Sequence, residues 1–186
     1  MLRITGGRLR GRRIPAPKGK NTRPTLEKPR AGIFDTLSQW IDLEGAEIWD
    51  CFAGSGALGI EALSRGAERA IFLESHAPSA AALRATLRAL SLPESQWSVF
   101  TTRAETWLRD RACDPALRLI LLDPPYASPL AGAVLEQLGG LASLPHEAVI
   151  VLETDRRNRP DIPASLELLK SKSYGDTELI YLNRCR

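Results

Sequence analysis

The chain has 186 residues, 44% of them hydrophobic and 25% charged, a composition ordinary for a soluble globular protein of one domain or one domain with an appendage. Three cysteines without a CxxC spacing and only two histidines exclude a histidine-rich metal site and predict a metal-free protein in a reducing compartment. Residues 1–25 lack the apolar core of a signal peptide, and no apolar run approaches the roughly 18 residues of a membrane span, so we expect a cytoplasmic protein without membrane contact.

The formal net charge of +3 conceals a basic N-terminal segment. Ten lysines and arginines precede residue 31, where Glu27 is the only acidic residue. A basic segment on a nearly neutral remainder indicates a polyanionic partner, although a disordered solubilising tail has the same composition. The candidates for contact with that partner are Arg3, Arg8, Arg10, Arg12, Arg13, Lys18, Arg23, Lys28 and Arg30.

The N-terminus itself predicts a small folded appendage. Residues 2–5 and 8–10 interleave apolar and basic side chains on either side of Gly6-Gly7, which is typical of a short β-hairpin. A stretch with proline and glycine, 15–24, then indicates a connector. We therefore divide the chain into a basic β-hairpin extension with its connector, 1–25, and a main domain, 26–186.

Helix and strand patterns alternate through the main domain. A helix is expected to begin near Pro29, because proline is tolerated at the first helical position, and to bury Ile33, Phe34, Leu37, Trp40 and Ile41. The remaining apolar patterns predict strands at 46–50, 69–74, 97–101, 117–123 and 148–153, helices at 58–64, 78–90, 104–111 and 130–138, and an antiparallel hairpin of 166–173 with 178–183. The expected fold class is therefore α/β, a doubly wound, Rossmann-like sheet with an antiparallel edge hairpin at its C-terminus.

A glycine-rich segment follows the first predicted strand. Gly54, Gly56 and Gly59 satisfy the G-x-G-x-x-G pattern of dinucleotide sites, which keeps a nicotinamide-dependent oxidoreductase as an alternative. However, Asp50 stands at the strand end, four residues before Gly54, and its carboxylate would repel a pyrophosphate. It suits a ligand with positive charge, and S-adenosylmethionine carries both an ammonium and a sulfonium group.

Further acids follow the next two strands. Glu74 ends the second strand, where a carboxylate can accept hydrogen bonds from both ribose hydroxyls, unless it is simply a solvated surface acid. Ala104 and Glu105 follow the third strand, where an adenine edge is expected, although Glu105 also suits an exposed helix N-terminus. The candidate cofactor residues are Asp50, Phe52, Ala53, Gly54, Ser55, Gly56, Leu58, Glu74, Ser75, Ala104 and Glu105, whereas Cys51 is interpreted as a small buried hydrophobe.

The fourth predicted strand ends in Asp123-Pro124-Pro125-Tyr126. Each proline lacks an N–H group and fixes φ near −65°, so the chain must leave the sheet there. The Asp123 carboxylate and the Pro124 carbonyl are then two acceptors beside the flat ring of Tyr126, an arrangement that fits the exocyclic amine of a nucleobase. A turn with an exposed aromatic side chain is the simpler alternative, and we take these four residues as the catalytic candidates.

Together these motifs resemble the RsmD family of 16S ribosomal RNA guanine-N2 methyltransferases, and the likeness spans essentially the whole chain. Residues 50–67 resemble the family's cofactor loop. The other similar segments are Arg3-Ile4-Thr5-Gly6-Gly7 with Arg10-Gly11-Arg12, Arg23-Pro24-Thr25, Leu122-Asp123-Pro124-Pro125-Tyr126 and Tyr174-Gly175-Asp176-Thr177. The chain departs from the family where Pro29 replaces an aliphatic residue and where Ala31 replaces a common Glu.

The resemblance implies methyl transfer from S-adenosylmethionine to the exocyclic N2 of one guanine in 16S ribosomal RNA, with no metal. The implied partner is this RNA, within an assembling small ribosomal subunit, and the basic residues would hold its phosphates. Methylation of adenine N6 or cytosine N4 in DNA or another RNA remains an alternative, because the catalytic motif is shared among amino-methylating enzymes. A non-catalytic RNA-binding module is a further alternative.

Overall fold

The computed structural model describes residues 1–16, 27–109, 111–125 and 128–185, without the side chains of 27–29. The helices there are α1 (Glu27–Leu37), α2 (Ala57–Ser64), α3 (Ala77–Ala89), α4 (Ala104–Trp107) and α5 (Leu130–Gly140), with short 3-10 turns η1 (Glu94–Gln96) and η2 (Arg156–Asn158). The strands are β1 (Leu2–Arg3), β2 (Arg13–Ile14), β3 (Glu47–Asp50), β4 (Arg69–Leu73), β5 (Trp97–Phe100), β6 (Leu117–Leu122), β7 (Val149–Asp155), β8 (Leu166–Tyr174) and β9 (Thr177–Arg184).

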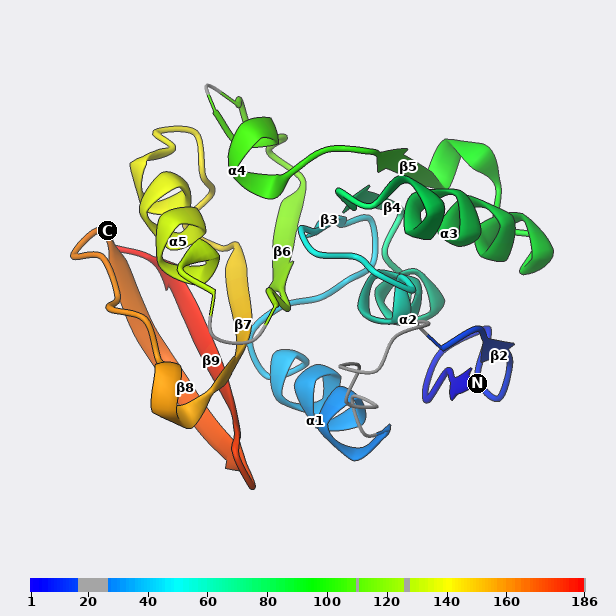
Figure 1. The fold of residues 1–186 in the computed structure, drawn as a ribbon, viewed down its shortest axis with the longest axis horizontal. Helices are drawn as coiled ribbons and strands as arrows, with labels where there is room; N and C mark the ends of the chain where they lie inside the picture. The colour runs from blue at the N-terminus through cyan, green and yellow to red at the C-terminus, as the bar shows by residue number, and fades with distance from the viewer. Residues whose placement is uncertain (17–26, 110, 126–127, 186) are drawn as a thin grey trace.

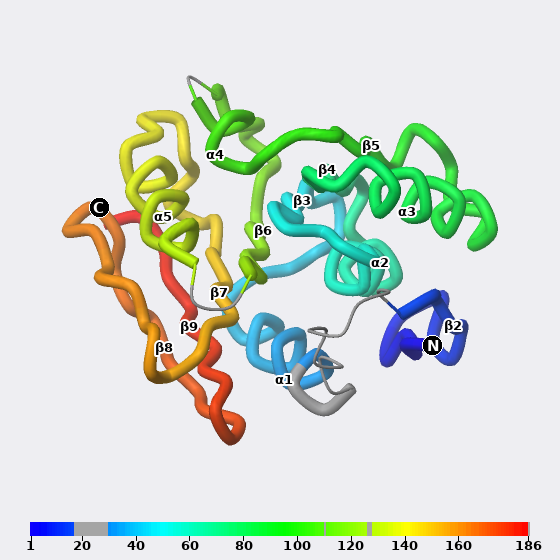
Figure 2. The backbone as a smooth tube through the Cα atoms, viewed as in Figure 1, coloured from blue at the N-terminus to red at the C-terminus, as the bar shows by residue number. Residues whose placement is uncertain are grey.

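In the described part of the chain, seven strands form one sheet in the order β5-β4-β3-β6-β7-β9-β8. The five strands from β3 to β7 pair in parallel, because a helix or loop crossover returns the chain to the same end of the sheet each time. β9 then pairs antiparallel with β7, and β8 with β9, so their hairpin forms one edge and β5 the other (Figure 2). The predicted doubly wound sheet with an antiparallel C-terminal edge is therefore confirmed.

Helices cover both faces of the sheet (Figure 1). On one face, α1, α2 and α3 contribute Phe34, Leu63 and Leu83 to a buried cluster that also contains Ile4 and Ile14 of the N-terminal hairpin. On the other face, α4 and α5 contribute Ala104, Leu135 and Leu138 to a second buried cluster. Successive residues of the central strands are buried alternately in the two clusters, which explains why these strands are apolar throughout.

The structure corrects three of the predicted boundaries. The N-terminal hairpin pairs Leu2 with Ile14 and Arg3 with Arg13, so residues 8–10 belong to its loop and not to its second strand. α1 ends at Leu37, and Trp40, predicted on its buried face, is 39% exposed. α4 ends at Trp107, four residues before the predicted end. Among the described residues, the helices are too short or too polar to cross a membrane.

The strand order defines where a ligand can bind. The chain builds outward from β3 through β4 to β5, and then returns to the other side of β3 to form β6 and β7. In sheets of this topology the loops that leave the two strands at the reversal turn in opposite directions, and ligands usually bind in the crevice between them, at the carboxyl ends of the strands. Here these two strands are β3 and β6. The glycine-rich loop follows β3, and Asp123-Pro124-Pro125 follows β6.

Candidate active site

Four acids occupy the carboxyl ends of four neighbouring strands. In sheet order they are Glu74 after β4, Asp50 at the end of β3, Asp123 after β6 and Glu153 near the end of β7. The residues two positions earlier, Phe72, Ile48, Leu121 and Val151, are all buried in the cluster under α1, α2 and α3. Because side chains alternate along a strand, the four carboxyl groups point to this same face. We call these four residues the acidic row.

Burial and mutual proximity change the acidity of this row. Burial raises the pKa of Asp50 to about 7, and the charges of Asp123 and Glu74 add to that rise, against hydrogen bonds from the Gly59 and Phe52 backbones. Burial likewise raises the pKa of Asp123 to about 6. Burial and the charge of Asp123 raise the pKa of Glu153 to about 8. Carboxyl groups that resist ionisation together are stabilised by a cationic ligand, because an opposite charge favours their ionised form.

The glycine-rich loop connects β3 to α2. Gly54 and Gly56 have φ of +52° and +76°, a region that side chains with a Cβ rarely adopt. A Cβ on Gly56 would lie 2.3 Å from Leu83 Cδ1, so glycine there lets α2 approach α3, whereas a Cβ on Gly54 would meet no atom within 4 Å. The loop therefore presents open space at Gly54 and close packing at Gly56.

Two acids of the row also hold this loop in place. Asp50 Oδ2 accepts a hydrogen bond of 3.0 Å from the backbone N–H of Gly59 in the first turn of α2. Glu74 Oε2 accepts one of 2.9 Å from Gly54, and Glu74 Oε1 accepts one of 2.7 Å from His76. Carboxylate oxygens have two lone pairs each, so these contacts leave Glu74 capacity for ligand hydroxyl groups.

The remaining cofactor candidates surround the same loop. Ala53, Leu58 and Ala104 are buried in the core, and Ser75 is exposed beside Glu74. Phe52, Ser55 and Glu105 are half-buried, and the Glu105 carbonyl accepts a hydrogen bond from Gln137 that joins α4 to α5. Cys51 is buried, as predicted, and burial raises the pKa of its thiol well above the ordinary range.

The catalytic candidates follow β6 on the other side of the crevice. Asp123 is half-buried, Pro124 is buried and Pro125 is exposed. The two prolines line a small cavity of about 10 Å³ with Ser128, Ala131, Glu153, Thr154, Asp155 and Asn158. Tyr126, the predicted stacking surface, lies outside the described residues. Glu153 was not among the candidates, although the same signal, an acid directly after an apolar strand, was present in the sequence.

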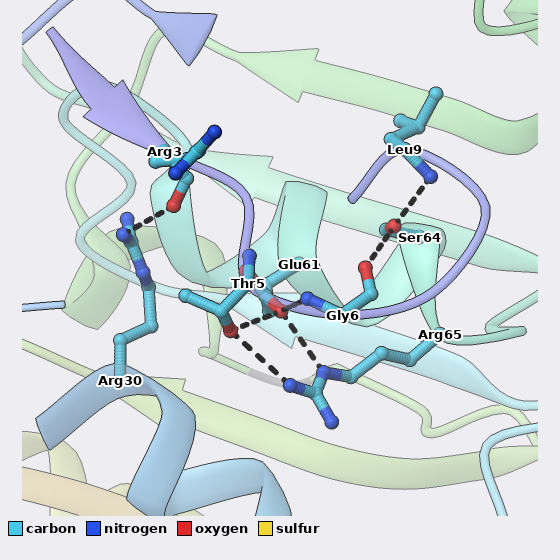
Figure 3. Close-up of polar contacts among 8 residues, drawn as sticks. All are labelled: Arg3, Thr5, Gly6, Leu9, Arg30, Glu61, Ser64 and Arg65. Atoms are coloured by element: carbon cyan, nitrogen blue, oxygen red, sulfur yellow. Dashed lines mark hydrogen bonds and ion pairs between the residues drawn. The ribbon is translucent and has the colours of Figure 1, made fainter. Parts of the chain in front are cut away.

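The N-terminal hairpin is anchored to the C-terminal half of α2 by a buried carboxylate (Figure 3). Glu61, which is 0% exposed, accepts hydrogen bonds of 2.9 Å and 2.7 Å from the backbone N–H groups of Thr5 and Gly6 and one of 2.7 Å from the Thr5 hydroxyl. Arg65 Nε lies 3.0 Å from the same carboxylate. Ser64 adds bonds to Gly6 and Leu9. The helix that begins at the glycine-rich loop therefore also carries the hairpin.

This anchor leaves all five hairpin arginines on the surface. Arg3, Arg8, Arg10, Arg12 and Arg13 are exposed, and Arg8 and Arg12 contact Gln96 and the Ala89 carbonyl near the end of α3. The structure contradicts the prediction that Arg30 lies on the surface, where it could contact the polyanionic partner. Arg30 is 1% exposed, and its guanidinium donates a 2.6 Å hydrogen bond to the Arg3 carbonyl (Figure 3). Lys18, Arg23 and the Lys28 side chain lie outside the described residues.

Comparisons with known proteins extend over nearly the whole chain. The family model described as "Conserved hypothetical protein 95" matches residues 2–183. Proteins named ribosomal RNA small subunit methyltransferase D are 33% identical, from Haemophilus influenzae over 94% of this chain and 89% of that protein, and from Escherichia coli over 94% and 85%. The solved structure of an Escherichia coli candidate methyltransferase, yhhF, has a TM-score of 0.84 at 31% identity and covers 98% of this chain and 97% of its own. That of a Haemophilus influenzae candidate methylase has a TM-score of 0.82 at 30% identity, over 100% and 99%.

Proposed function

We infer that this chain, which belongs to the conserved hypothetical protein 95 family, is a methyltransferase of the ribosomal RNA small subunit methyltransferase D type, the family that its motifs resemble. From this premise we propose that it transfers a methyl group from S-adenosylmethionine to the exocyclic N2 of one guanine in 16S ribosomal RNA. The observation that carries the proposal is the acidic row, which lies under the glycine-rich loop and continues directly into Asp123-Pro124-Pro125.

The residues around the loop fit this methyl donor. Asp50 and Glu74 supply negative charge to a ligand with an ammonium and a sulfonium, and Glu74 has acceptors for ribose hydroxyls. The open space at Gly54 allows a ligand to approach the backbone. When bound, the donor supplies a methyl group on a positively charged sulfur, which leaves as a neutral thioether. The oxidoreductase alternative is not supported, because the similar relatives and solved structures described above are named as methyltransferases or methylases.

Asp123 and the Pro124 carbonyl would act on the target amine. The lone pair of a guanine amine is conjugated with the ring, so the amine is a poor nucleophile. Two acceptors that draw its hydrogens favour a pyramidal nitrogen with an available lone pair. Holding the reactants in line can contribute roughly 7–11 kcal/mol, and stacking on Tyr126 about 1–3 kcal/mol. Asp123 stabilises the positive charge that develops on nitrogen and accepts the proton that it loses.

The exposed hairpin arginines would hold the phosphates of the RNA. Since Glu61 fixes the hairpin to α2, these cations keep a constant position relative to the glycine-rich loop. Phosphate contacts supply affinity and orientation, whereas the choice of guanine comes from the pocket and the choice of site from the shape of the RNA. The target base must be unpaired or leave its stack to reach Asp123.

The function is tested with small ribosomal subunits that lack the modification and a labelled methyl donor. After digestion of the RNA to nucleosides, mass spectrometry is expected to find the label in N2-methylguanosine. Label in N6-methyladenosine or N4-methylcytidine would instead support the alternative amino methyltransferases, and the absence of any methylated nucleoside would contradict the proposal. DNA treated in parallel provides the control for substrate class.

Gly54→Ala is expected to weaken S-adenosylmethionine binding by at least about tenfold, because the added methyl group enters the space open to the ligand. The matched control is Gly175→Ala, since Gly175 also has a positive φ of +63° and no atom within 4 Å of the place that a Cβ would occupy. Both variants carry a similar backbone cost of about 1 kcal/mol. Calorimetric titration checks the expectation, and equal donor affinities in the two variants would contradict this position for the donor.

Replacing Arg10, Arg12 and Arg13 together by alanine is expected to weaken RNA binding while the affinity for the methyl donor stays unchanged. The three side chains are exposed on the hairpin, away from the glycine-rich loop. If each contacts one phosphate, the slope of log affinity against log salt falls by about 2–3. Filter binding at several salt concentrations measures the slope, and a loss confined to donor affinity would refute this role.

A further inference from the structure

Glu153 has an unusual environment for a carboxyl group. It is 7% exposed, and among the residues that the structure describes its Oε2 atom has no hydrogen-bond partner. A buried acceptor without a partner is unfavourable, and native proteins seldom retain one without a reason. The other buried acids of β9 and α2 differ in this respect, because Glu178 contacts Arg159 at 3.1 Å and Glu61 binds the hairpin.

The strand register places Glu153 beside the reaction site. The last pair between β6 and β7 is Leu122 with Leu152, so the next residues along the two strands are Asp123 and Glu153. Neighbouring strands lie about 4.8 Å apart, and both side chains point to the same face of the sheet. Glu153 also lines the small cavity with Pro124 and Pro125. Its unpartnered oxygen is therefore next to the two acceptors proposed for the target amine.

We propose that Glu153 accepts the N1–H of the target guanine and so makes the site selective for guanine. This inference rests on the proposed function and adds a specificity residue to it. Guanine carries two donors side by side on one edge, the N1–H and the N2 amine, which match two neighbouring carboxyl groups. Adenine and cytosine instead present a ring-nitrogen acceptor beside the exocyclic amine, so they would place a lone pair against Glu153.

The electrostatics of the row agree with this assignment. Burial and the charge of Asp123 raise the pKa of Glu153 to about 8, so the ionised form that accepts the N1–H is unfavourable in the free protein. A hydrogen bond donated by the base would favour the ionised carboxylate and satisfy its unpartnered oxygen. Ionisation of the acidic row is unfavourable in the free protein. It becomes favourable when the donor cation and the guanine edge are both present.

The test is a double-mutant cycle between the enzyme and its substrate. Small subunits are assembled with either guanine or 2-aminopurine at the position that the wild type methylates. 2-Aminopurine retains the reacting amine but has an acceptor in place of the N1–H. The wild type is expected to prefer guanine by about 100-fold in kcat/KM, since a site that hydrogen-bonds a substrate N–H strongly rejects an analogue without it.

Glu153→Leu is expected to reduce this preference to about tenfold or less, because it removes the acceptor. Glu153→Gln is expected to lie between the wild type and Glu153→Leu, because its amide oxygen can accept the N1–H whereas its NH2 group can donate to the ring nitrogen of 2-aminopurine. Glu178→Gln is the matched control, since Glu178 is equally buried but lies on β9 with Arg159. It should leave the preference unchanged. Thermal melting and calorimetric donor affinity show whether each variant is folded.

One result would overturn the inference: a preference for guanine in Glu153→Leu equal to that of the wild type. A merely structural role would slow methylation of both substrates alike and leave their ratio unchanged. Failure of the wild type to methylate guanine in these subunits would contradict the proposed function itself, and the two failures are therefore distinguishable.

Discussion

Replacing Asp123 by alanine is expected to slow methyl transfer by at least about a thousandfold while RNA binding persists. The substitution removes an acceptor for the amine, the negative charge that stabilises the developing cation and the group that takes the proton. None of these contributes to holding phosphates, which is the role proposed for the hairpin on the far side of α2. Single-turnover methylation and filter binding on the same RNA measure the two effects separately.

The control is Asp161→Ala, which removes an exposed carboxylate that is not part of the acidic row and should change neither rate nor binding. A protein that binds RNA but never methylates it would be equally inactive before and after the substitution of Asp123, which separates the non-catalytic module from an enzyme. Turnover that is unchanged in Asp123→Ala would refute the catalytic role.

The pH dependence of methyl transfer follows from the raised pKa of Asp123. Burial raises the pKa of Asp123 from 3.8 to about 6, and the reactive form is the ionised one, so the wild-type rate should fall as the pH drops through about 6. Asp123→Asn keeps an acceptor oxygen without an ionisable group, and its smaller residual rate, reduced about tenfold to a hundredfold, should lack this decline. Asp50 and Glu153 titrate nearby, so the comparison of the two profiles isolates Asp123.

The raised pKa of Asp123 also predicts that the decline in activity at low pH does not come from unfolding. Because the folded-state pKa lies above the ordinary value, the folded protein binds this proton more tightly than the unfolded chain does. The resulting stabilisation is present below about pH 4 and is lost as the pH rises through about 6. Above that pH the ionised, buried carboxylate is unfavourable in the free protein, and Asp123→Ala should melt no lower than the wild type at pH 8.

Glu61→Ala is expected to release the N-terminal hairpin from α2, at a cost of about 3 kcal/mol. The substitution leaves the backbone N–H groups of Thr5 and Gly6, together with Arg65, without the buried acceptor that they share (Figure 3). Hydrogen exchange of the amides in residues 2–14 should therefore accelerate, and RNA affinity should fall because the exposed arginines lose their fixed position. Donor affinity should change little, since Asp50 and Glu74 still hold the glycine-rich loop.

An exposed ion pair with the same distance provides the control. Arg88 Nε and Glu94 Oε1 are 3.0 Å apart, as are Arg65 Nε and Glu61 Oε1, but both members of the first pair are largely exposed. Glu94→Ala should therefore cost no more than about 1 kcal/mol. If both substitutions had similarly small effects on hydrogen exchange and RNA affinity, Glu61 would not be the anchor of the hairpin.

Local patterns predicted most of the elements and the positions of several acids at strand ends. The apolar run 70–73 and the acids Asp50 and Glu74 at the strand ends could be identified from the sequence, because burial on both faces and the exit of the chain from a sheet leave signatures in consecutive residues. The Gly6-Gly7 turn was one exception. Glycine pairs are typical of tight hairpin turns, yet here the loop continues to Gly11 before β2 begins. The hydrogen bonds between the loop backbone and α2 outweigh the local preference for a tight turn.

By itself the sequence determined the order of strands and helices, the glycine-rich loop, the Asp-Pro-Pro-Tyr motif and the family. Only the tertiary structure decided that Glu153 stands beside Asp123, that Glu61 is the anchor of the hairpin and that Arg30 is buried beneath it. The reason is that these roles depend on neighbours 30, 56 and 27 positions away along the chain. The residue type alone does not show whether an acidic side chain is solvated or buried. Strand order and helix packing decide which of the two occurs in the folded protein.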